Sequence, residues 1–146
     1  MKKILTTLTL ALVALATALH AGEDGWITEY KKAVEQAKAE KKLVLLDFTG
    51  SDWCGWCIKL NKEVFSQQKF KDYAKQNLVL VEVDFPRSKE QSAEVKKQNQ
   101  ELQEKYHIDG YPTIIVLNGN GEKVGQLGYQ PGGPDAFIAE LAKLKK

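Results

Sequence analysis

The pattern of apolar and polar positions along this chain predicts helices in some segments and strands in others. Residues 26–42 have helical spacing, which places Ile27, Tyr30, Val34 and Ala37 on one face. We therefore expect an amphipathic helix to precede the first long apolar run. No internal repeat, low-complexity tract or linker divides the chain after this point.

Two apolar runs of strand length follow. Residues 43–48 and 78–85 are apolar at nearly every position, which is typical of strands buried on both faces. Between them, residues 57–73 have helical spacing, and Ser66 is expected to break that helix and cap a second one.

The last third of the chain predicts a helix, a hairpin and a final helix. Residues 88–108 form a polar helical segment, and residues 113–118 and 123–129 are strands joined by the turn sequence GNGE. Residues 132–146 have helical spacing with a proline near the first turn. Alternating elements followed by a hairpin predict an α/β fold, with a mixed central sheet and helices on both faces.

The first 21 residues are set apart from this pattern. A basic start (MKK), an apolar run and small residues follow one another, which is the order of a secretory signal peptide. The run also approaches the length of a membrane anchor, but no basic stop-transfer cluster follows it. We expect cleavage after Ala21, with Ala18 as the alternative. A single domain over residues 22–146 would then lie in the bacterial periplasm or another exported compartment.

Charge excludes two classes of partner. Removal of residues 1–21 takes Lys2 and Lys3 with it, so that 19 basic residues balance 19 acidic ones. A chain with no net charge has no general electrostatic attraction to nucleic acid or to an anionic membrane.

The two cysteines of the chain, Cys54 and Cys57, stand in the sequence WCGWC. As a structural clip they would close a very short loop, which contributes only about 2 kcal/mol before strain. As a zinc site they supply two of the four ligands that are needed, and His107 is the one histidine left after signal cleavage. The pair does not match the motif for covalent haem attachment, because Ile58 stands where that motif requires a histidine.

A reactive dithiol has a physical mechanism. A sulfur placed just before a helix faces unpaired N–H groups and the positive end of the helix dipole, which favour the thiolate. Cys54 is then the nucleophile, and Cys57, one turn later, resolves the mixed disulfide that Cys54 forms with a substrate. Strand, sharp turn, cysteine pair and helix follow in the order that this geometry needs.

The sequence resembles the thioredoxin family over essentially all of residues 22–146. The resemblance is carried by LLDF leading into WCGWC, by YHIDGYPTIIVLN, and by the hairpin and final helix. It implies a thioredoxin fold with an extra N-terminal helix. It also implies that Pro112 is a cis-proline facing the dithiol, and that Tyr111 contacts the backbone of an incoming peptide.

Asp47 resembles the family's buried acid, which moves the proton of the resolving thiol. Between Leu46 and Phe48 its carboxylate would be desolvated, which raises the pKa. The alternative is an aspartate that merely hydrogen-bonds the next turn. Two departures affect its geometry. The segment TGSD carries one residue more than the commonest spacing, and the lysine that often partners this acid has no counterpart in LVLVEVDF.

Two tryptophans flank the first cysteine. Trp53 matches the family's tryptophan before the nucleophile and is expected to shield one side of the groove. Trp56 replaces the proline that the commonest members carry between the cysteines. It adds no charge and enlarges the apolar surface, which favours protein substrates. Simple packing is the alternative for either ring.

These features predict an exported thiol–disulfide oxidoreductase that reduces or isomerises disulfides of proteins. Its electrons would come from a partner dithiol, with no separate cofactor, no metal, no nucleic acid and no stable membrane insertion after signal cleavage. The lack of a charged residue between the cysteines favours a reductase or isomerase over a strong oxidant. The alternatives are a dithiol oxidase and a redox-inert thioredoxin-fold module that binds a partner protein or copper.

Overall fold

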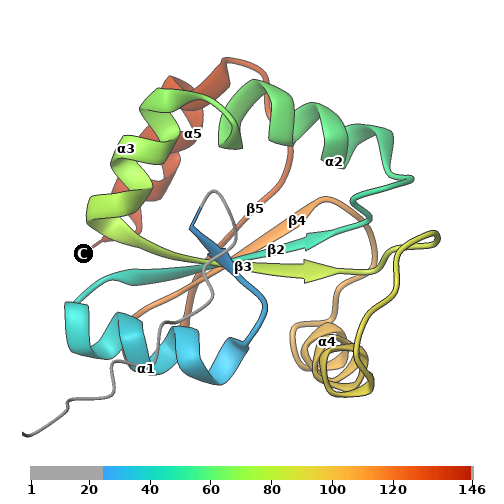
Figure 1. The fold of residues 1–146 in the computed structure, drawn as a ribbon. Coiled ribbons are helices and arrows are strands. Elements are labelled where there is room, and N and C mark those ends of the chain that lie inside the picture. The colour runs from blue at the N-terminus through green and yellow to red at the C-terminus, as the bar shows by residue number, and fades with distance from the viewer. Residues whose placement is uncertain (1–24, 146) are drawn as a thin grey trace, which may run out of the picture.

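A five-stranded sheet lies between two layers of helices in the computed structural model, which describes residues 25–145 (Figure 1). The strand order across the sheet is β1-β3-β2-β4-β5. β1, β3 and β2 are parallel, β4 runs antiparallel to β2, and β5 runs antiparallel to β4. The strands are β1 (Trp26–Ile27), β2 (Leu43–Thr49), β3 (Leu78–Asp84), β4 (Thr113–Leu117) and β5 (Lys123–Leu127). The predicted mixed sheet with helices on both faces is confirmed.

The helices divide between the two faces of the sheet (Figure 1). The elements α2, α3 and α5 cover one face, and α1 and α4 cover the other. The helices are α1 (Tyr30–Glu40), α2 (Gly55–Leu60), α3 (Gln68–Asn77), α4 (Ala93–Lys105) and α5 (Gly133–Lys143). A π-helical turn, η1 (Asn61–Phe65), continues α2. Pro134 stands in the first turn of α5, as predicted.

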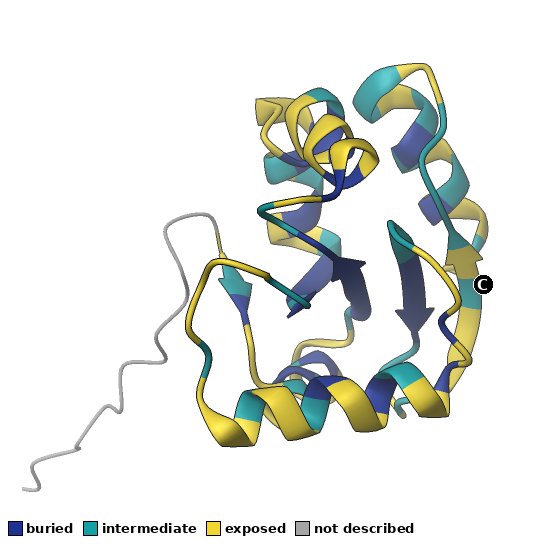
Figure 2. Cartoon of the chain, turned by 90° about the vertical axis from the view of Figure 1, so that its right-hand side faces the viewer, coloured by how far each residue is buried: buried dark blue, intermediate teal, exposed yellow. Residues whose placement is uncertain are grey.

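The core consists of two apolar clusters, one on each side of the sheet. β2 is buried at every position, and its alternate residues therefore contribute to both clusters. Val44, Leu46 and Phe48 pack toward α1 and α4, whereas Leu43 and Leu45 pack toward α2, α3 and α5. Figure 2 shows the buried strands in the middle and exposed residues on the outer sides of the helices. This rigid centre fixes the end of β2, where the cysteines follow.

Two predicted elements are wrong in detail. Ile27 lies in β1, paired with β3, and not on the first helix, which begins at Tyr30. Its spacing from Tyr30 fits a helix, but a two-residue edge strand is too short to show a period of its own. The helix breaks at Ser66 as predicted, but Ser66 is the C-cap of η1 and not the cap of α3, whose N-cap is Gln67; the Ser66 hydroxyl donates to Oδ1 of Asn61 at 2.6 Å.

The predicted signal peptide, residues 1–21, lies outside the described residues. Within residues 25–145, no helix has the length and apolar character needed to cross a membrane.

Candidate active site

The cysteine pair lies at the carboxyl end of β2, where α2 begins (Figure 1). Cys54 is the N-cap residue of α2, and its sulfur accepts a hydrogen bond from the backbone N–H of Cys57 at 3.2 Å. The two sulfurs form a disulfide, and both cysteines are largely buried. The helix starts at Gly55, two residues before the predicted start. The expected arrangement of a sulfur facing a helix N-terminus is therefore present.

A tight turn brings the chain from β2 into the helix. The carbonyl oxygen of Gly50 accepts hydrogen bonds from the N–H groups of Trp53 at 3.1 Å and Cys54 at 2.8 Å. Gly50 is buried, and a Cβ atom there would lie 2.4 Å from the ring of Trp53. Glycine is required at this position because the indole ring occupies the space of a side chain.

The extra residue in TGSD has a structural use. The backbone N–H and the hydroxyl of Ser51 both donate to the carboxylate of Asp84, at 2.9 and 2.5 Å. The carboxylate of Asp52 accepts from the backbone N–H groups of Arg87 and Ser88, at 3.0 and 2.7 Å. These bonds lower the pKa of Asp52. The lengthened turn is thus tied to β3 and to the loop that follows β3.

Trp53 is held on three sides. Its indole N–H donates to the carbonyl oxygen of Phe85 at 2.8 Å, and the Arg87 guanidinium lies 4.0 Å from its ring centroid. Its ring meets the ring of Tyr111 edge to face, with centroids 5.9 Å apart. These contacts bring the WCGWC motif together with the distant GYPT segment, as the resemblance implies.

The peptide bond between Tyr111 and Pro112 is cis, as predicted. Pro112 directly precedes β4, whose first residue, Thr113, pairs with Phe48 near the end of β2. The proline therefore lies at the same edge of the sheet as the dithiol. The hydroxyl of Tyr111 accepts a hydrogen bond from Gln103 of α4 at 3.1 Å, which fixes the tyrosine ring.

Asp47 lies inside the sheet, on the face that α2 covers. Its Oδ1 atom is buried and has no hydrogen-bond partner among the described residues. Burial, together with the nearby carboxylates of Glu82 and Asp84, raises the pKa of its carboxyl to about 8. Asp47 and Cys57 line one cavity of about 480 Å³. A buried acid with an unpartnered oxygen therefore shares one cavity with Cys57.

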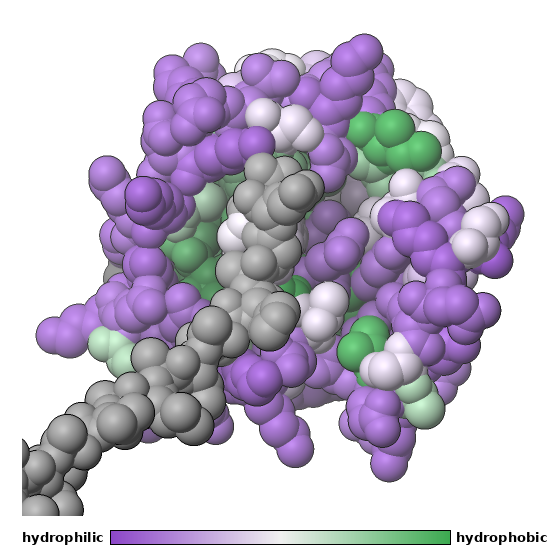
Figure 3. Space-filling view, in the orientation of Figure 1, coloured by the Kyte–Doolittle hydropathy of each residue, from purple (hydrophilic) through white to green (hydrophobic). Residues whose placement is uncertain are grey.

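Trp56 is the most exposed large apolar side chain in the part of the chain that the structure describes, at 57%. Its ring packs against Tyr129 with centroids 4.9 Å apart, and the ammonium of Lys59 lies 5.0 Å from the Trp56 centroid and 5.1 Å from that of Tyr129. The Tyr129 hydroxyl donates to Glu63 at 2.8 Å. Figure 3 shows a largely hydrophilic surface with a hydrophobic patch over α2, where Ile58 is also exposed. An apolar surface beside the cysteines is therefore present.

Sequence reasoning missed several neighbours of the dithiol. Glu82, Phe85 and Tyr129 were assigned to strands and Arg87 to no element, and none was given a role at the site. Glu82 stands inside an apolar run, and a charged residue there was the one available signal. The positions of the other three depend on contacts between distant segments: Phe85 and Arg87 contact Trp53, and Tyr129 contacts Trp56. They were not predictable from local pattern.

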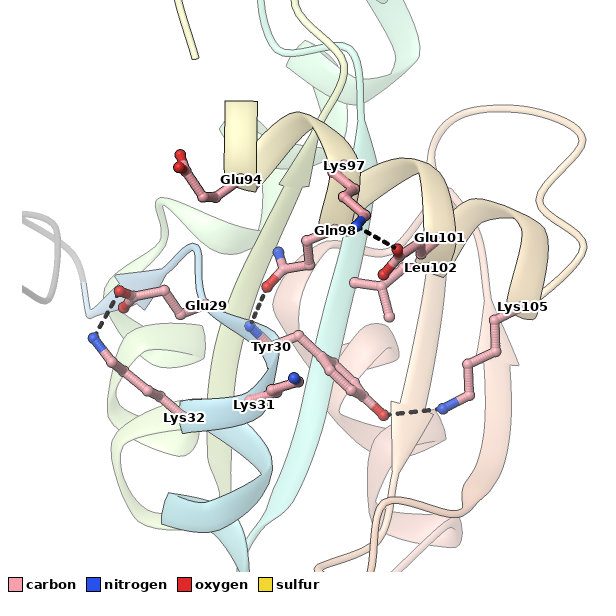
Figure 4. A pocket seen from close by; sticks show the side chains of 10 residues that line it. All are labelled: Glu29, Tyr30, Lys31, Lys32, Glu94, Lys97, Gln98, Glu101, Leu102 and Lys105. Carbon is pink, nitrogen blue, oxygen red and sulfur yellow. Dashed lines mark hydrogen bonds and ion pairs between the residues drawn. The ribbon is translucent and has the colours of Figure 1, made fainter. Parts of the chain in front are cut away.

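Other features lie apart from this site. A cavity of about 740 Å³ lies between the start of α1 and α4, lined mainly by charged side chains and by Tyr30 and Gln98 (Figure 4). His107 is exposed at the end of α4, with a φ of 53°. Over residues 25–145, no group of three or more histidine, cysteine or acidic side chains is arranged to hold a metal ion.

Comparison with known proteins places these features in a family. A family model described as a thioredoxin-like domain matches residues 30–145. The chain is 37% identical over 117 residues to the disulfide bond reductase DsbH of Chlamydia pneumoniae, covering 80% of this chain and 70% of the relative. It is 31% identical to the thioredoxin-related protein DsbJ of the same organism, covering 86% of this chain but 37% of that relative.

A solved structure supports the same conclusion. The structure titled DsbH oxidoreductase superposes with a TM-score of 0.78 at 32% identity, over 96% of this chain and 94% of the other. The predicted fold and the predicted class of enzyme, a thiol–disulfide oxidoreductase, are confirmed by these relatives together with the cysteine pair. The chain belongs to the thioredoxin-like family.

Proposed function

We propose that this chain is an exported thiol–disulfide oxidoreductase that reduces or isomerises disulfides of proteins. One observation carries the proposal. The Cys54 sulfur accepts the N–H of Cys57 at the first turn of α2, and this contact stabilises a thiolate at Cys54 once the disulfide is reduced. The relative named as a disulfide bond reductase supports the direction.

The reaction has two steps. In the first, the Cys54 thiolate attacks one sulfur of a substrate disulfide, forms a mixed disulfide, and releases the other substrate sulfur as a thiolate that takes a proton from water. In the second, Asp47 accepts the proton of the Cys57 thiol, and the Cys57 thiolate attacks Cys54. The disulfide Cys54–Cys57 forms, the second substrate sulfur leaves as a thiolate that takes a proton from water, and two electrons have passed to the substrate. A partner dithiol then reduces the pair again.

The rings around the dithiol bind the substrate. Tyr111 and Pro112 would hold the backbone of the substrate segment, because they lie at the same sheet edge as the cysteines. Trp53, fixed by Phe85 and Arg87, forms one wall. Trp56 offers exposed apolar area on the other side of Cys54. Protein substrates suit such a surface because they bury it on binding.

Export rests on the signal-like segment of residues 1–21. The mass of the exported chain tests it directly. Cleavage after Ala21 gives a protein that begins at Gly22, and cleavage after Ala18 gives one that begins at Leu19.

Reduction of insulin disulfides in the presence of dithiothreitol tests the function. We expect the wild-type chain to accelerate the reaction and Cys54→Ser to abolish the acceleration. Equal activity of the two proteins would contradict the proposal and favour a redox-inert binding module. Equilibration with glutathione then measures the reduction potential of the cysteine pair. Thioredoxin-like reductants have potentials of about −270 mV and strong oxidants of about −120 mV, so the value shows in which direction the pair acts.

A further inference from the structure

Glu82 faces Asp47 across the pairing of β2 and β3. The two residues are direct partners in the parallel register, so their side chains leave the sheet on the same face from strands about 4.8 Å apart. Figure 1 shows these two strands side by side beneath α2. Glu82 is half-buried, whereas Asp47 is buried.

Both carboxyls line the cavity that reaches Cys57, and within residues 25–145 they are the only acidic groups on its wall. The rest of the wall is mostly polar. Thr49 and Ser51 come from the end of β2 and the turn after it, and the other polar side chains come from η1 and the turn that follows. This polar cavity connects the sulfur of Cys57, the buried carboxyl of Asp47 and the more exposed carboxyl of Glu82.

The charged groups around Glu82 come from several elements. Asp47 on β2 and Asp84 on β3 are acidic, and Asp84 accepts two hydrogen bonds from Ser51. Lys89, from the loop after β3, and Lys62, on the cavity wall in η1, are basic. Burial and Asp84 raise the pKa of Glu82, and Lys89 lowers it. Two facing carboxyls in such a site resist being ionised together.

We propose that Glu82 is a positioning residue for the resolving step: it shares one proton with Asp47 and thereby sets the pH at which Asp47 accepts the proton of Cys57. This inference rests on the proposed role of Asp47 as that acceptor. When Cys57 loses its proton, the carboxyl pair gains it, and the half-exposed Glu82 returns it to water. The Cys57 thiolate then displaces the substrate sulfur from Cys54, as described above.

The resolving step can be measured by itself with 5,5′-dithiobis(2-nitrobenzoate). The reduced protein releases one coloured thiolate when Cys54 attacks and a second when Cys57 resolves the mixed disulfide. The second phase is first-order and does not depend on reagent concentration. Its rate is followed by stopped flow from pH 5 to pH 10 for the wild-type protein, Glu82→Gln, Glu82→Asp, Asp47→Asn and the Asp47→Asn/Glu82→Gln double variant.

We expect Glu82→Gln to move the midpoint of this profile down by about one pH unit, because Asp47 loses a facing negative charge. Glu82→Asp keeps the charge and should stay near the wild-type midpoint. In the Asp47→Asn background, Glu82→Gln should change nothing further. Glu104→Gln removes a charge from an exposed position of α4 outside the cavity, and it should leave the midpoint unchanged.

The outcomes separate the two proposals. If Asp47→Asn alters the profile but Glu82→Gln does not, the inference on Glu82 is overturned and the role of Asp47 stands. A change of the same size in both backgrounds also overturns it, since Glu82 would then act independently of Asp47. If Asp47→Asn leaves the profile unchanged, the role of Asp47 and the inference fall together.

Discussion

Trp56 packs on Tyr129 with ring centroids 4.9 Å apart, although 57% of its surface remains exposed. Lys59 lies near both rings, and Glu63 accepts the hydroxyl of Tyr129. The residue between the cysteines is therefore held in place while most of its apolar area faces water. Held aromatic rings of this kind lose little side-chain entropy when a partner covers them.

Trp56→Ala should weaken the binding of protein substrates more than the binding of small ones. We expect kcat/KM for insulin to fall about tenfold, mainly through KM, because a truncated contact ring typically costs more than 1 kcal/mol. The rate with oxidised glutathione should change by less than about twofold. Val124→Ala, an exposed apolar residue of β5, is the matched control and should alter neither rate. Equal losses for both substrates would show that Trp56 acts on the dithiol itself.

Asp47 should make the protein less stable as the pH rises. In the unfolded chain its carboxyl ionises near 3.8, whereas in the folded protein its pKa is about 8. Between these values the folded state binds more protons, so the free energy of unfolding falls with rising pH and levels off above about pH 8.

Asp47→Asn removes this dependence. We expect the variant to be more stable than the wild-type protein at pH 8, by on the order of 5 kcal/mol, and nearly equal to it at pH 4. Urea denaturation at the two pH values measures the difference. Asp109→Asn, at an exposed position, should give parallel curves. A gain of the same size at pH 4 would show that the ionisation of Asp47 is not its cause.

Gly50→Ala should disturb the turn that carries the cysteines. The added methyl would lie 2.4 Å from the Trp53 ring, so the indole must move away from Phe85 and Arg87. We expect a loss of about 1–3 kcal/mol in the free energy of unfolding and slower insulin reduction. Gly110→Ala is the control, because a Cβ there meets nothing within 4 Å. Comparable losses in both variants would argue against the steric cause.

Local structure could be predicted from the sequence wherever a short motif determines the backbone geometry around it. The cysteine pair after a buried strand predicted the sulfur at the N-cap of α2, and GYPT predicted the cis bond before Pro112. Asp47 was identified by its resemblance to the family's buried acid, and the raised pKa expected from its burial is confirmed.

What the sequence did not show depends on pairing between distant segments. Glu82 meets Asp47 only through the register of β2 and β3, which no local pattern specifies. Tyr129 was assigned to a strand, but β5 ends at Leu127 and the tyrosine packs on Trp56. The extra residue in TGSD was noted, and its bonds to the chain around Asp84 and Arg87 became visible only in three dimensions.

The central claim is that Cys54 attacks the substrate and Cys57 resolves the intermediate. Trapping tests it most directly. Reduced Cys57→Ser is mixed with oxidised insulin, quenched with acid and analysed by intact mass, with Cys54→Ser treated in parallel. We expect Cys57→Ser to accumulate a covalent mixed disulfide mapped to Cys54, and Cys54→Ser to form little or none. An adduct mapped to Cys57, or no adduct in either variant, would contradict it.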